Sequence, residues 1–335
     1  MKNIAIIGSG SWGVALAIHL ANNGNNVKLW SFDESEANLI NNEKKCKFLP
    51  NITIPDNIKC FLNFEDVIPE SDIILHVTPS KFTRNIFNQY KKYITNQPII
   101  VCSKGLEQST LSILTDVIKE ELPTAKVGVL SGPSHAEEVS IEIPTVLVSA
   151  SDDEYVRNYV QDLFMNKNMR VYTSDDMIGV EYGAALKNII AFCAGIAVEI
   201  DLGDNTFAAL LTRGLTEIAR LGVKVGAKKD TFYGLTGLGD LIVTCNSEHS
   251  RNRKAGMLMG QGYTMDEATK EVKMVVEGIY SAKAALALAR KYNISMPIIE
   301  QVNKVLFENT KVKDAVMELM QRDKTTEYAA LEWED

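Results

Sequence analysis

The chain has 335 residues, 46% of them hydrophobic and 23% charged, which is ordinary for a globular protein with room for two domains. Its formal net charge of −8 argues against a general binder of nucleic acids or of anionic membranes, because both need a basic surface. An anionic ligand would therefore have to be held by a local basic cluster.

The first predicted strand, 4–7, runs directly into Gly8-Ser9-Gly10-Ser11-Trp12-Gly13, a G-x-G-x-x-G sequence that opens a predicted helix. Gly8 allows a tight turn, Gly10 lets a pyrophosphate approach the backbone, and Gly13 lets the helix pack closely on the strand. The helix N-terminus offers free N–H groups to phosphates. The pattern predicts a dinucleotide-binding loop, with a glycine turn of purely structural value as the alternative. Asp33, after the second strand, lies at the distance expected for a ribose contact.

The first half of the chain alternates strand and helix patterns, as in a mostly parallel sheet covered on both faces. Eight strands are expected, at Ile4–Ile7, Val27–Trp30, Ile58–Leu62, Ile73–Val77, Ile99–Cys102, Val127–Leu130, Thr145–Ser149 and Met169–Tyr172. Helical patterns between them cover Glu34–Asn42, Lys81–Tyr93 and Leu111–Glu121. The segment Lys47–Asp56 contains two prolines and is predicted to be an ordered loop.

From about Asp175 onward, strand patterns give way to long helical ones. Helices are expected at Met177–Ile200, Thr206–Val225, Thr264–Glu271, Ile279–Tyr292, Met296–Phe307 and Lys311–Met320. We therefore expect a Rossmann-like, doubly wound α/β domain over 1–175 that binds a dinucleotide, followed by an all-α substrate and catalytic domain over 176–335. The acidic tail, Thr325–Asp335, is expected to be frayed.

The cysteines and histidines point to neither disulfides nor a metal. The five cysteines are widely spaced without a C-x-x-C pair, which favours a reducing compartment, and the four histidines have no metal-ligand spacing. No signal-peptide pattern is present, and the longest apolar run, 189–198, is about half of a membrane span. We expect a cytoplasmic protein that does not insert stably into membranes.

Three polar segments follow strands of the predicted sheet: Thr78–Ser80, Ser103–Gly105 and Ser131–Ala136. Ligands of open α/β sheets bind at these strand ends, so the positions favour function. Lys104 would meet an anionic substrate or the cofactor there, with a solvated surface lysine as the alternative. His135 could act as an acid or base, although a packing or hydrogen-bonding role is favoured.

Lys187 lies in a helical stretch of alanines and branched aliphatic residues. An unpaired lysine in such surroundings is costly unless it neutralises or meets a partner, and burial can tune its acidity, so it is a candidate acid or base. A lysine that extends its charge to the rim of the protein is an equal alternative.

A glycine-rich segment, 234–241, carries Asp240 on a constrained turn, and a basic patch follows it at 250–254. Arg251 could grip a phosphate in a fork, with Ser250 and Asn252 as neutral donors. An exposed charged loop without a ligand is the alternative.

Seven short motifs occur in one order along the chain: Gly-Ser-Gly-Ser-Trp-Gly, Ser-Lys-Gly-Leu at 103–106, Ser-Gly-Pro-Ser at 131–134, Ala-Leu-Lys-Asn at 185–188, Gly-Leu-Gly-Asp-Leu at 237–241, Ser-Arg-Asn at 250–252 and Val-Glu-Gly at 276–278. Together they resemble the soluble bacterial NAD(P)-dependent glycerol-3-phosphate dehydrogenase. The resemblance covers nearly the whole chain.

The resemblance implies roles for particular residues. Beside the glycine loop, the cofactor would be lined by Ser11, Trp12, Phe32 at the end of the second strand, Lys104, Ala136, Arg251, Val275 and Glu277. The substrate would be lined by Lys104, Gly132, Ser134, Lys187, Asp240, Ser250, Arg251 and Asn252. Lys187 would transfer the proton, with Lys104 and Asp240 orienting the oxygens of the substrate.

By the same resemblance, the expected reaction is the reversible reduction of dihydroxyacetone phosphate to sn-glycerol 3-phosphate by NADH or NADPH, with a product that feeds phospholipid synthesis. Family members favouring NADP often carry Arg or His where this chain has Phe32, and Asp33 and Glu34 would repel a 2′-phosphate, so NADH is favoured. Lys44 and Lys45 are near enough in sequence to oppose that preference.

Two other functions stay open at this point. A related hydroxy-acid or sugar-acid dehydrogenase would have a carboxylate pocket in place of the phosphate site, and a nucleotide sensor would bind cofactor without turnover. The partner expected is a small phosphorylated triose and not a nucleic acid. The oligomeric state is open, with a homodimer as the form considered.

Overall fold

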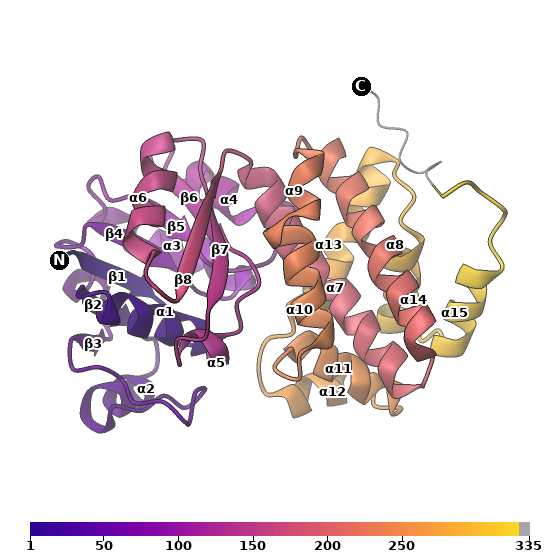
Figure 1. Ribbon diagram of the computed structural model, residues 1–335, viewed down its shortest axis with the longest axis horizontal. Helices are drawn as coiled ribbons and strands as arrows, with labels where there is room; N and C mark the ends of the chain where they lie inside the picture. The colour runs from indigo at the N-terminus through magenta and orange to yellow at the C-terminus, as the bar shows by residue number, and fades with distance from the viewer. Residues whose placement is uncertain (328–335) are drawn as a thin grey trace. The chain divides into compact units, whose positions relative to one another are not determined.

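The computed structural model of the chain describes residues 1–327, which form two compact units (Figure 1). The first unit consists of Met1–Glu107 and Ser112–Met177, and the second of Gln108–Leu111 and the chain from Ile178 onward. Within the expected frayed tail, residues 325–327 are in neither a helix nor a strand, and residues 328–335 lie outside the described part.

The first unit is built on one sheet of eight strands in the order β3-β2-β1-β4-β5-β6-β7-β8. The strands are β1 (Asn3–Ile7), β2 (Asn26–Trp30), β3 (Ile58–Phe61), β4 (Ile73–His76), β5 (Ile99–Val101), β6 (Val127–Ser131), β7 (Thr145–Ala150) and β8 (Met169–Ser174). All neighbouring pairs are parallel except β6 and β7. The eight predicted strands and the mostly parallel sheet are therefore confirmed.

The strand order reverses at β1, and this reversal puts helices on both faces. From β1 the chain passes to β2 in one direction, and from β4 it passes to β5 and β6 in the other, so right-handed crossovers place their helices on opposite sides. Accordingly α1 (Ser11–Asn22) packs with α5 (Ala136–Val139) and α6 (Glu154–Phe164), whereas α3 (Thr83–Tyr90) packs with α4 (Leu114–Glu121) (Figure 1). The central strands are buried on both faces, which explains their continuous Ile and Val runs.

Helix ends in this unit differ from the expectation. The predicted helix Glu34–Asn42 is α2 (Glu34–Asn38) followed by a π-helical turn, Leu39–Glu43, and the predicted helix Lys81–Tyr93 is α3 with 3₁₀ turns at both ends. The periodic pattern continues through these tighter or wider turns, so it does not reveal where the α-helix stops. Residues 47–56 form turns and loop as predicted.

The described part of the second unit consists of helices and their connections. They are α7 (Met177–Glu199), α8 (Gly203–Lys224), α9 (Lys229–Tyr233), the π-helical η5 (Leu235–Gly239), α10 (Asp240–Asn246), α11 (Arg251–Gly260), α12 (Met265–Val272), α13 (Glu277–Tyr292), α14 (Pro297–Phe307) and α15 (Val312–Met320). The six helices expected here are present. The prediction missed α9, α10 and α11, which have only 5, 7 and 10 residues and carry polar side chains.

The long helix α7 is the core of this unit. It is long and apolar enough to cross a membrane, but 89% of its most apolar window is buried inside the protein. It lies almost backbone to backbone with α11: a Cβ added at Gly195 would lie 2.0 Å from the carbonyl oxygen of Arg253, and one at Gly256 would lie 1.9 Å from that of Phe192. Glycine at both positions is what permits this approach.

The N-terminus of α14 is bound by a buried acid from α8. The Glu217 carboxylate accepts hydrogen bonds from the backbone N–H groups of Ile298 (2.8 Å) and Ile299 (3.2 Å). It thereby satisfies two donors that the first turn of a helix leaves unpaired. Burial raises the pKa of Glu217 to about 7 despite these bonds.

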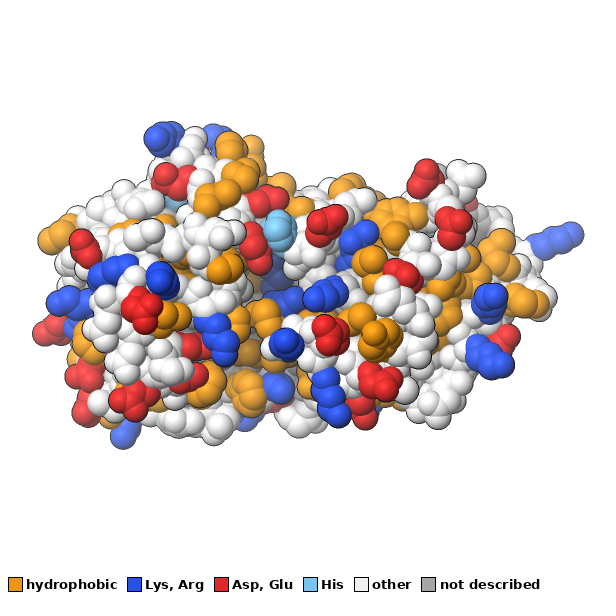
Figure 2. All heavy atoms as spheres, turned by 90° about the horizontal axis from the view of Figure 1, so that it is seen from below, with side chains coloured by type: hydrophobic (Ala, Val, Ile, Leu, Met, Phe, Trp, Pro, Cys, Tyr) orange, Lys and Arg blue, Asp and Glu red, His pale blue; other side chains and the backbone are white. Residues whose placement is uncertain are grey.

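The visible surface mixes the two signs of charge. Figure 2 shows Lys and Arg side chains interspersed with Asp and Glu over one face of the protein, with hydrophobic groups between them. Together with the net charge of −8, this mixture means that an anionic ligand would have to be held by individual basic residues.

Candidate active site

The glycine loop between β1 and α1 has the backbone that the sequence predicted. Gly8 has φ +127°, a left-handed value that favours glycine, and a Cβ there would lie 2.9 Å from the carbonyl oxygen of Val77. A Cβ at Gly13 would lie 2.0 Å from the carbonyl oxygen of Gly8. By contrast, a Cβ at Gly10 would meet nothing within 4 Å among the described residues. The loop therefore has no room for a side chain at Gly8 or Gly13, whereas the space beside Gly10 is empty of protein atoms from the described residues.

Gly10 is also the N-cap of α1, and as a glycine it gives this helix no side-chain capping hydrogen bond. The N–H groups of its first turn are thus available to a ligand, and an open space beside Gly10 lets an anion reach them. These features fit a dinucleotide pyrophosphate.

The neighbouring strand ends carry the other candidates of the first unit. The indole N–H of Trp12 donates to the carbonyl of Cys102 (3.1 Å), just after β5. The ammonium of Lys104 donates to the carbonyl of Gly132 (2.9 Å), and the Ser134 hydroxyl donates to the same oxygen (3.0 Å). Lys104, Gly132 and Ser134 are thereby brought together, as their positions after β5 and β6 predicted.

His135 and Ala136 begin the short helix α5. The backbone of His135 is the N-cap of this helix, its side chain is half-buried, and Ala136 is buried. The two roles considered for His135, acid–base chemistry or packing, both remain open.

The end of β2 presents an exposed ring and two acids in different surroundings. Phe32 is 81% exposed. Asp33 caps α2, and hydrogen bonds from the hydroxyl and then the N–H of Ser35 lower its pKa. Glu36, in contrast, is buried and accepts a hydrogen bond from the hydroxyl of Ser9 in the glycine loop (2.6 Å). The sequence analysis did not identify Glu36, whose carboxylate holds the glycine loop through this bond to Ser9.

In the second unit, Lys187 forms a buried ion pair with Asp240. The ammonium lies 3.0 Å from the carboxylate and donates a hydrogen bond to the hydroxyl of Thr244 (2.6 Å). The exposed fractions of the two charged side chains are only 6% and 2%. Lys187 therefore does not extend to the rim of the protein, and the carboxylate stabilises its ammonium form.

Close backbone packing explains why these distant residues meet. A Cβ at Gly183, one turn before Lys187 on α7, would lie 2.9 Å from the carbonyl oxygen of Thr236 in η5. The glycine lets the π-helical turn lie against α7, and Asp240 follows that turn directly as the first residue of α10. The expected constrained turn at Asp240 is thus wrong, because the glycine-rich segment before it is helical. Thr244 lies one turn further along α10.

A second buried polar contact joins three helices beside this pair. The side-chain amide of Asn252 on α11 donates to the side-chain oxygen of Asn188 on α7 (2.9 Å) and accepts from the N–H of Gly278 on α13 (2.8 Å). A Cβ at Gly278 would lie 2.5 Å from the carbonyl oxygen of Asn188. Because an amide carries two N–H donors, Asn252 keeps one for a ligand after bonding Asn188.

The basic patch is the N-terminus of α11 and not a loop. Ser250 is its N-cap, buried, and its hydroxyl accepts from the N–H of Arg253 (3.2 Å). Arg251 is the first residue of the helix and is exposed. A helix N-terminus with an arginine and two polar side chains is suited to a phosphate group. Within residues 1–327, no cluster of three or more His, Cys, Asp or Glu residues could hold a metal.

Two protein-family descriptions match the chain. "NAD-dependent glycerol-3-phosphate dehydrogenase N-terminus" matches residues 3–157, and "NAD-dependent glycerol-3-phosphate dehydrogenase C-terminus" matches residues 176–317. The chain belongs to the NAD-dependent glycerol-3-phosphate dehydrogenase family. The resemblance found in the sequence is therefore confirmed.

Relatives in this family are similar over their full length. The chain is 54% identical to glycerol-3-phosphate dehydrogenase [NAD(P)+] of Agathobacter rectalis over 335 residues, covering 99% of this chain and 100% of the relative. It is 56% identical to the protein of the same name from Fusobacterium nucleatum over 332 residues, covering 98% and 99%. The crystal structure of glycerol-3-phosphate dehydrogenase from Coxiella burnetii superposes with a TM-score of 0.93 at 37% identity, covering 96% of this chain and 99% of that one.

The residues predicted to form the site of this glycerol-3-phosphate dehydrogenase family member lie in both units. The glycine loop, Lys104, Gly132 and Ser134 lie in the first, and Lys187, Asp240, Ser250, Arg251 and Asn252 lie in the second. Val275 and Glu277 are half-buried and precede Gly278, which contacts Asn252. The prediction missed Asn188, Thr244 and Gly278. Thr244 follows Asp240 by one helical turn, a spacing that would have revealed it had α10 been recognised.

Proposed function

We propose that the protein catalyses the reversible reduction of dihydroxyacetone phosphate to sn-glycerol 3-phosphate with NADH or NADPH. The observation that carries this proposal is the buried Lys187–Asp240 ion pair beside the N-terminus of α11, within a chain of this family. The pair is suited to move one proton, and the helix N-terminus is suited to hold one phosphate. The relatives at 54% and 56% identity carry the name glycerol-3-phosphate dehydrogenase [NAD(P)+].

In this proposal Lys187 is the proton donor. Reduction of the ketone places negative charge on the oxygen at C2, and an ammonium beside it supplies the proton; in the reverse direction the neutral amine accepts it. Asp240 and Thr244 hold the ammonium at 3.0 and 2.6 Å. The Lys187 side chain therefore stays in one conformation, and its proton does not have to be brought into position during the reaction.

Ser250, Arg251 and Asn252 are the proposed phosphate ligands. Arg251 brings a charge-assisted fork, and the second N–H of the Asn252 amide and the α11 N-terminus add neutral donors. Binding energy from the phosphate orients the carbonyl for reaction. From the first unit we assign Lys104, Gly132 and Ser134 to the same substrate.

The cofactor residues proposed in the first unit are those of the glycine loop with Ser11, Trp12, Phe32, Lys104 and Ala136. Arg251, Val275 and Glu277 of the second unit are proposed to contribute as well. The open space at Gly10 and the uncapped α1 fit the pyrophosphate. When bound, the reduced nicotinamide supplies the hydride. Lys104 adds a fixed positive charge, since its ammonium is tied to the carbonyl of Gly132.

The direct test is oxidation of NADH by the purified protein with dihydroxyacetone phosphate as the substrate. We expect turnover with this substrate and little with 2-keto acids, whose carboxylate does not reproduce the phosphate dianion. Turnover of 2-keto acids at comparable kcat/KM would identify a hydroxy-acid dehydrogenase instead. Cofactor binding without turnover on either substrate would indicate a nucleotide sensor.

For cofactor choice we expect kcat/KM for NADH to exceed that for NADPH by about tenfold, or about 1.4 kcal/mol. Phe32 is 81% exposed where a cation would be needed, and Asp33 keeps its charge because its pKa is lowered. Lys44 is engaged with Asp56 (3.5 Å) and Lys45 with Glu43 (3.5 Å), whereas the charge of Lys47 acts on Asp33.

Steady-state kinetics with both cofactors tests this preference, and Phe32→Arg is the matched variant because its exposed position should tolerate the change. We expect it to improve the use of NADPH. If the unaltered protein used NADPH equally well or better, a lysine would set the choice, and Lys47→Ala would then show whether it is Lys47.

Two glycines of the loop should respond differently to the same substitution. Gly13→Ala would put a Cβ 2.0 Å from a backbone oxygen, so we expect a lower melting temperature and loss of cofactor binding together. Gly10→Ala has room within the protein, so we expect an unchanged melting temperature but cofactor binding at least about tenfold weaker. Thermal melts and NADH fluorescence titrations check both. Unchanged NADH affinity in Gly10→Ala would contradict the placement of the pyrophosphate.

We also propose that the protein works in the cytoplasm, as a homodimer, and supplies glycerol 3-phosphate for phospholipid synthesis. The five cysteines are free in the structure, which agrees with a reducing compartment. Sedimentation velocity of the purified protein would test the dimer.

A further inference from the structure

One buried acid of the first unit, Glu36 on α2, lies against the glycine loop. Its exposed fraction is 9%, and the hydroxyl of Ser9, between Gly8 and Gly10, donates to its Oε2 (2.6 Å). The hydroxyl of Ser31, the first residue after β2, donates to the same oxygen (3.3 Å). The carboxylate of Glu36 therefore lies where the glycine loop meets the carboxyl end of β2.

Strand pairing explains why these residues meet. β1 and β2 are parallel, with Ile7 opposite Trp30, and the N–H of Gly8 donates to the carbonyl of Trp30 (3.1 Å). Ser31 therefore lies beside the turn of the glycine loop. The helix α2 begins three residues later, and its third residue, Glu36, has its carboxylate at this strand end.

The second oxygen of this carboxylate is available to a ligand. Within residues 1–327, the hydrogen bonds of the Glu36 side chain go to Oε2, and Oε1 is not one of the fully enclosed polar atoms that lack a partner. Oε1 therefore keeps part of its surface open. The charge of the carboxylate acts on a neighbouring thiol, because burial first and Glu36 second raise the pKa of Cys60 to about 12.

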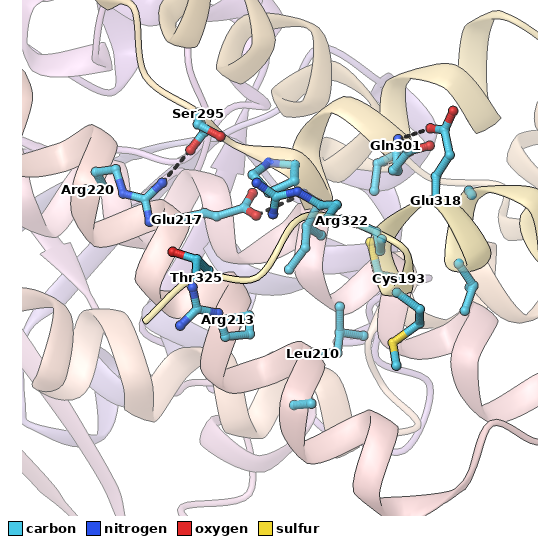
Figure 3. A pocket seen from close by; sticks show the side chains of 18 of the residues that line it. Cys193, Leu210, Arg213, Glu217, Arg220, Ser295, Gln301, Glu318, Arg322 and Thr325 are labelled. Atoms are coloured by element: carbon cyan, nitrogen blue, oxygen red, sulfur yellow. Dashed lines mark hydrogen bonds between the residues drawn. The ribbon is translucent and has the colours of Figure 1, made fainter. Parts of the chain in front are cut away.

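Two buried acids of the second unit have partners of a kind that Glu36 lacks. Asp240 is paired with the ammonium of Lys187 (3.0 Å). Glu217 gives one oxygen to each of two N–H groups at the N-terminus of α14, and Figure 3 shows it in a pocket of this unit near Arg220 of the same helix. Within the described part of the chain, the Glu36 side chain has neither kind of partner, and one of its oxygens is uncommitted. A buried charge of this kind needs a partner, and a ligand can supply it.

Given the proposed function, we propose that Glu36 binds the adenosine ribose of the cofactor and excludes the 2′-phosphate of NADPH. With the pyrophosphate at Gly10, the adenosine half extends over the carboxyl end of β2, where an acid accepts hydrogen bonds from the ribose hydroxyls. Oε1 of Glu36 is an acceptor at this place. A phosphate on the same hydroxyl would remove the donor and bring its own negative charge against the carboxylate.

The acid expected from the sequence to contact the ribose, Asp33, has another role in the structure. Its Oδ1 accepts hydrogen bonds from both the N–H (2.8 Å) and the hydroxyl (2.7 Å) of Ser35, so it caps α2. The proposal therefore assigns the ribose contact to Glu36. Phe32, beside Ser31, is 81% exposed and leaves room for the adenine there.

The first test is fluorescence titration of the full-length protein with NADH and with its analogue that lacks the adenosine 2′-hydroxyl, in the absence of substrate. We expect the analogue to bind at least about tenfold more weakly, the scale of one charge-assisted hydrogen bond. This comparison uses the unaltered protein, so it does not depend on the folding of a variant. Equal affinity for NADH and the analogue would overturn the proposal.

Glu36→Gln is the matched variant, because an amide keeps the size of the carboxylate and still accepts from Ser9. We expect it to lower the ratio of the NADPH to the NADH dissociation constant at least about tenfold. The control is Glu34→Gln, which removes the same charge from an exposed position of the same helix and should lower this ratio less than about threefold, because exposed charges are screened. An equal change in both variants, or an unchanged ratio in Glu36→Gln, would overturn the proposal.

Failure of the proposed function would give a different result. The titrations contain no substrate, so a protein that binds NADH but does not reduce dihydroxyacetone phosphate would still show the effects expected for Glu36. Turnover of dihydroxyacetone phosphate together with an unchanged ratio in Glu36→Gln would overturn the role of Glu36 alone.

Discussion

Lys187→Ala is expected to lower kcat at least about a hundredfold while leaving NADH affinity nearly unchanged. Loss of a general acid removes a stabilising interaction made only as charge develops on the substrate oxygen, and such losses are of this size. Steady-state kinetics with dihydroxyacetone phosphate gives kcat, and fluorescence titration gives the affinity for NADH.

The variant needs a control for folding because it leaves Asp240 buried without its cation. Removing one partner of a buried ion pair costs about 3–5 kcal/mol, so part of the protein could unfold. The double variant Lys187→Met/Asp240→Asn removes both charges and keeps the volume. We expect it to melt at a higher temperature than Lys187→Ala and to have an equally low kcat. If either variant kept most of its kcat, the proton donor would lie elsewhere, with Lys104 as the next candidate.

Arg251→Ala is expected to lower kcat/KM by roughly two orders of magnitude, since a charge-assisted fork contributes a few kcal/mol to phosphate binding. Added phosphite dianion should accelerate reduction of unphosphorylated dihydroxyacetone by the unaltered protein but not by the variant, because the variant has lost the anion site. The ratio of the two rates with and without phosphite is the measurement.

Lys254→Ala is the matched control for this prediction. Lys254 is exposed on the same helix, and its replacement removes the same charge from α11. We expect little change in kcat/KM and an intact response to phosphite. A loss in Lys254→Ala as large as that in Arg251→Ala would mean that the overall charge of the helix binds the phosphate and that Arg251 makes no specific fork.

The sequence predicted the first unit better than the second, for a physical reason. Strands buried on both faces are uninterrupted runs of branched aliphatic residues, and a glycine loop has a fixed place between a strand and a helix. The helix α11 contains two glycines and several polar residues, and one of these glycines, Gly256, packs against the backbone of α7, whereas α10 is only seven residues long, so neither helix shows a long apolar stripe in the sequence. Short or glycine-containing helices of this kind do not show the apolar period from which a helix is predicted.

Local sequence patterns also could not predict contacts between residues that lie far apart in the chain. Lys187 was identified as a buried lysine, but Asp240, 53 positions later, is its partner only because Gly183 lets η5 lie against α7. In the sequence, Glu36 cannot be told from an exposed acid on a short helix, and only the fold brings it to Ser9 of the glycine loop. Such contacts depend on tertiary packing and leave no periodic signal.

The close approach of α7 and α11 has a consequence for substrate length. In the proposed site, Lys187 on α7 reaches the carbonyl oxygen and Arg251 on α11 holds the phosphate. Gly195 and Gly256 set the separation of these helices through backbone contacts, which cannot yield as side chains do. The fixed distance between Lys187 and Arg251 in the proposed site would then accept a three-carbon ketose phosphate and exclude one that is longer by one carbon. A longer substrate would fit only if one of the two helices moved.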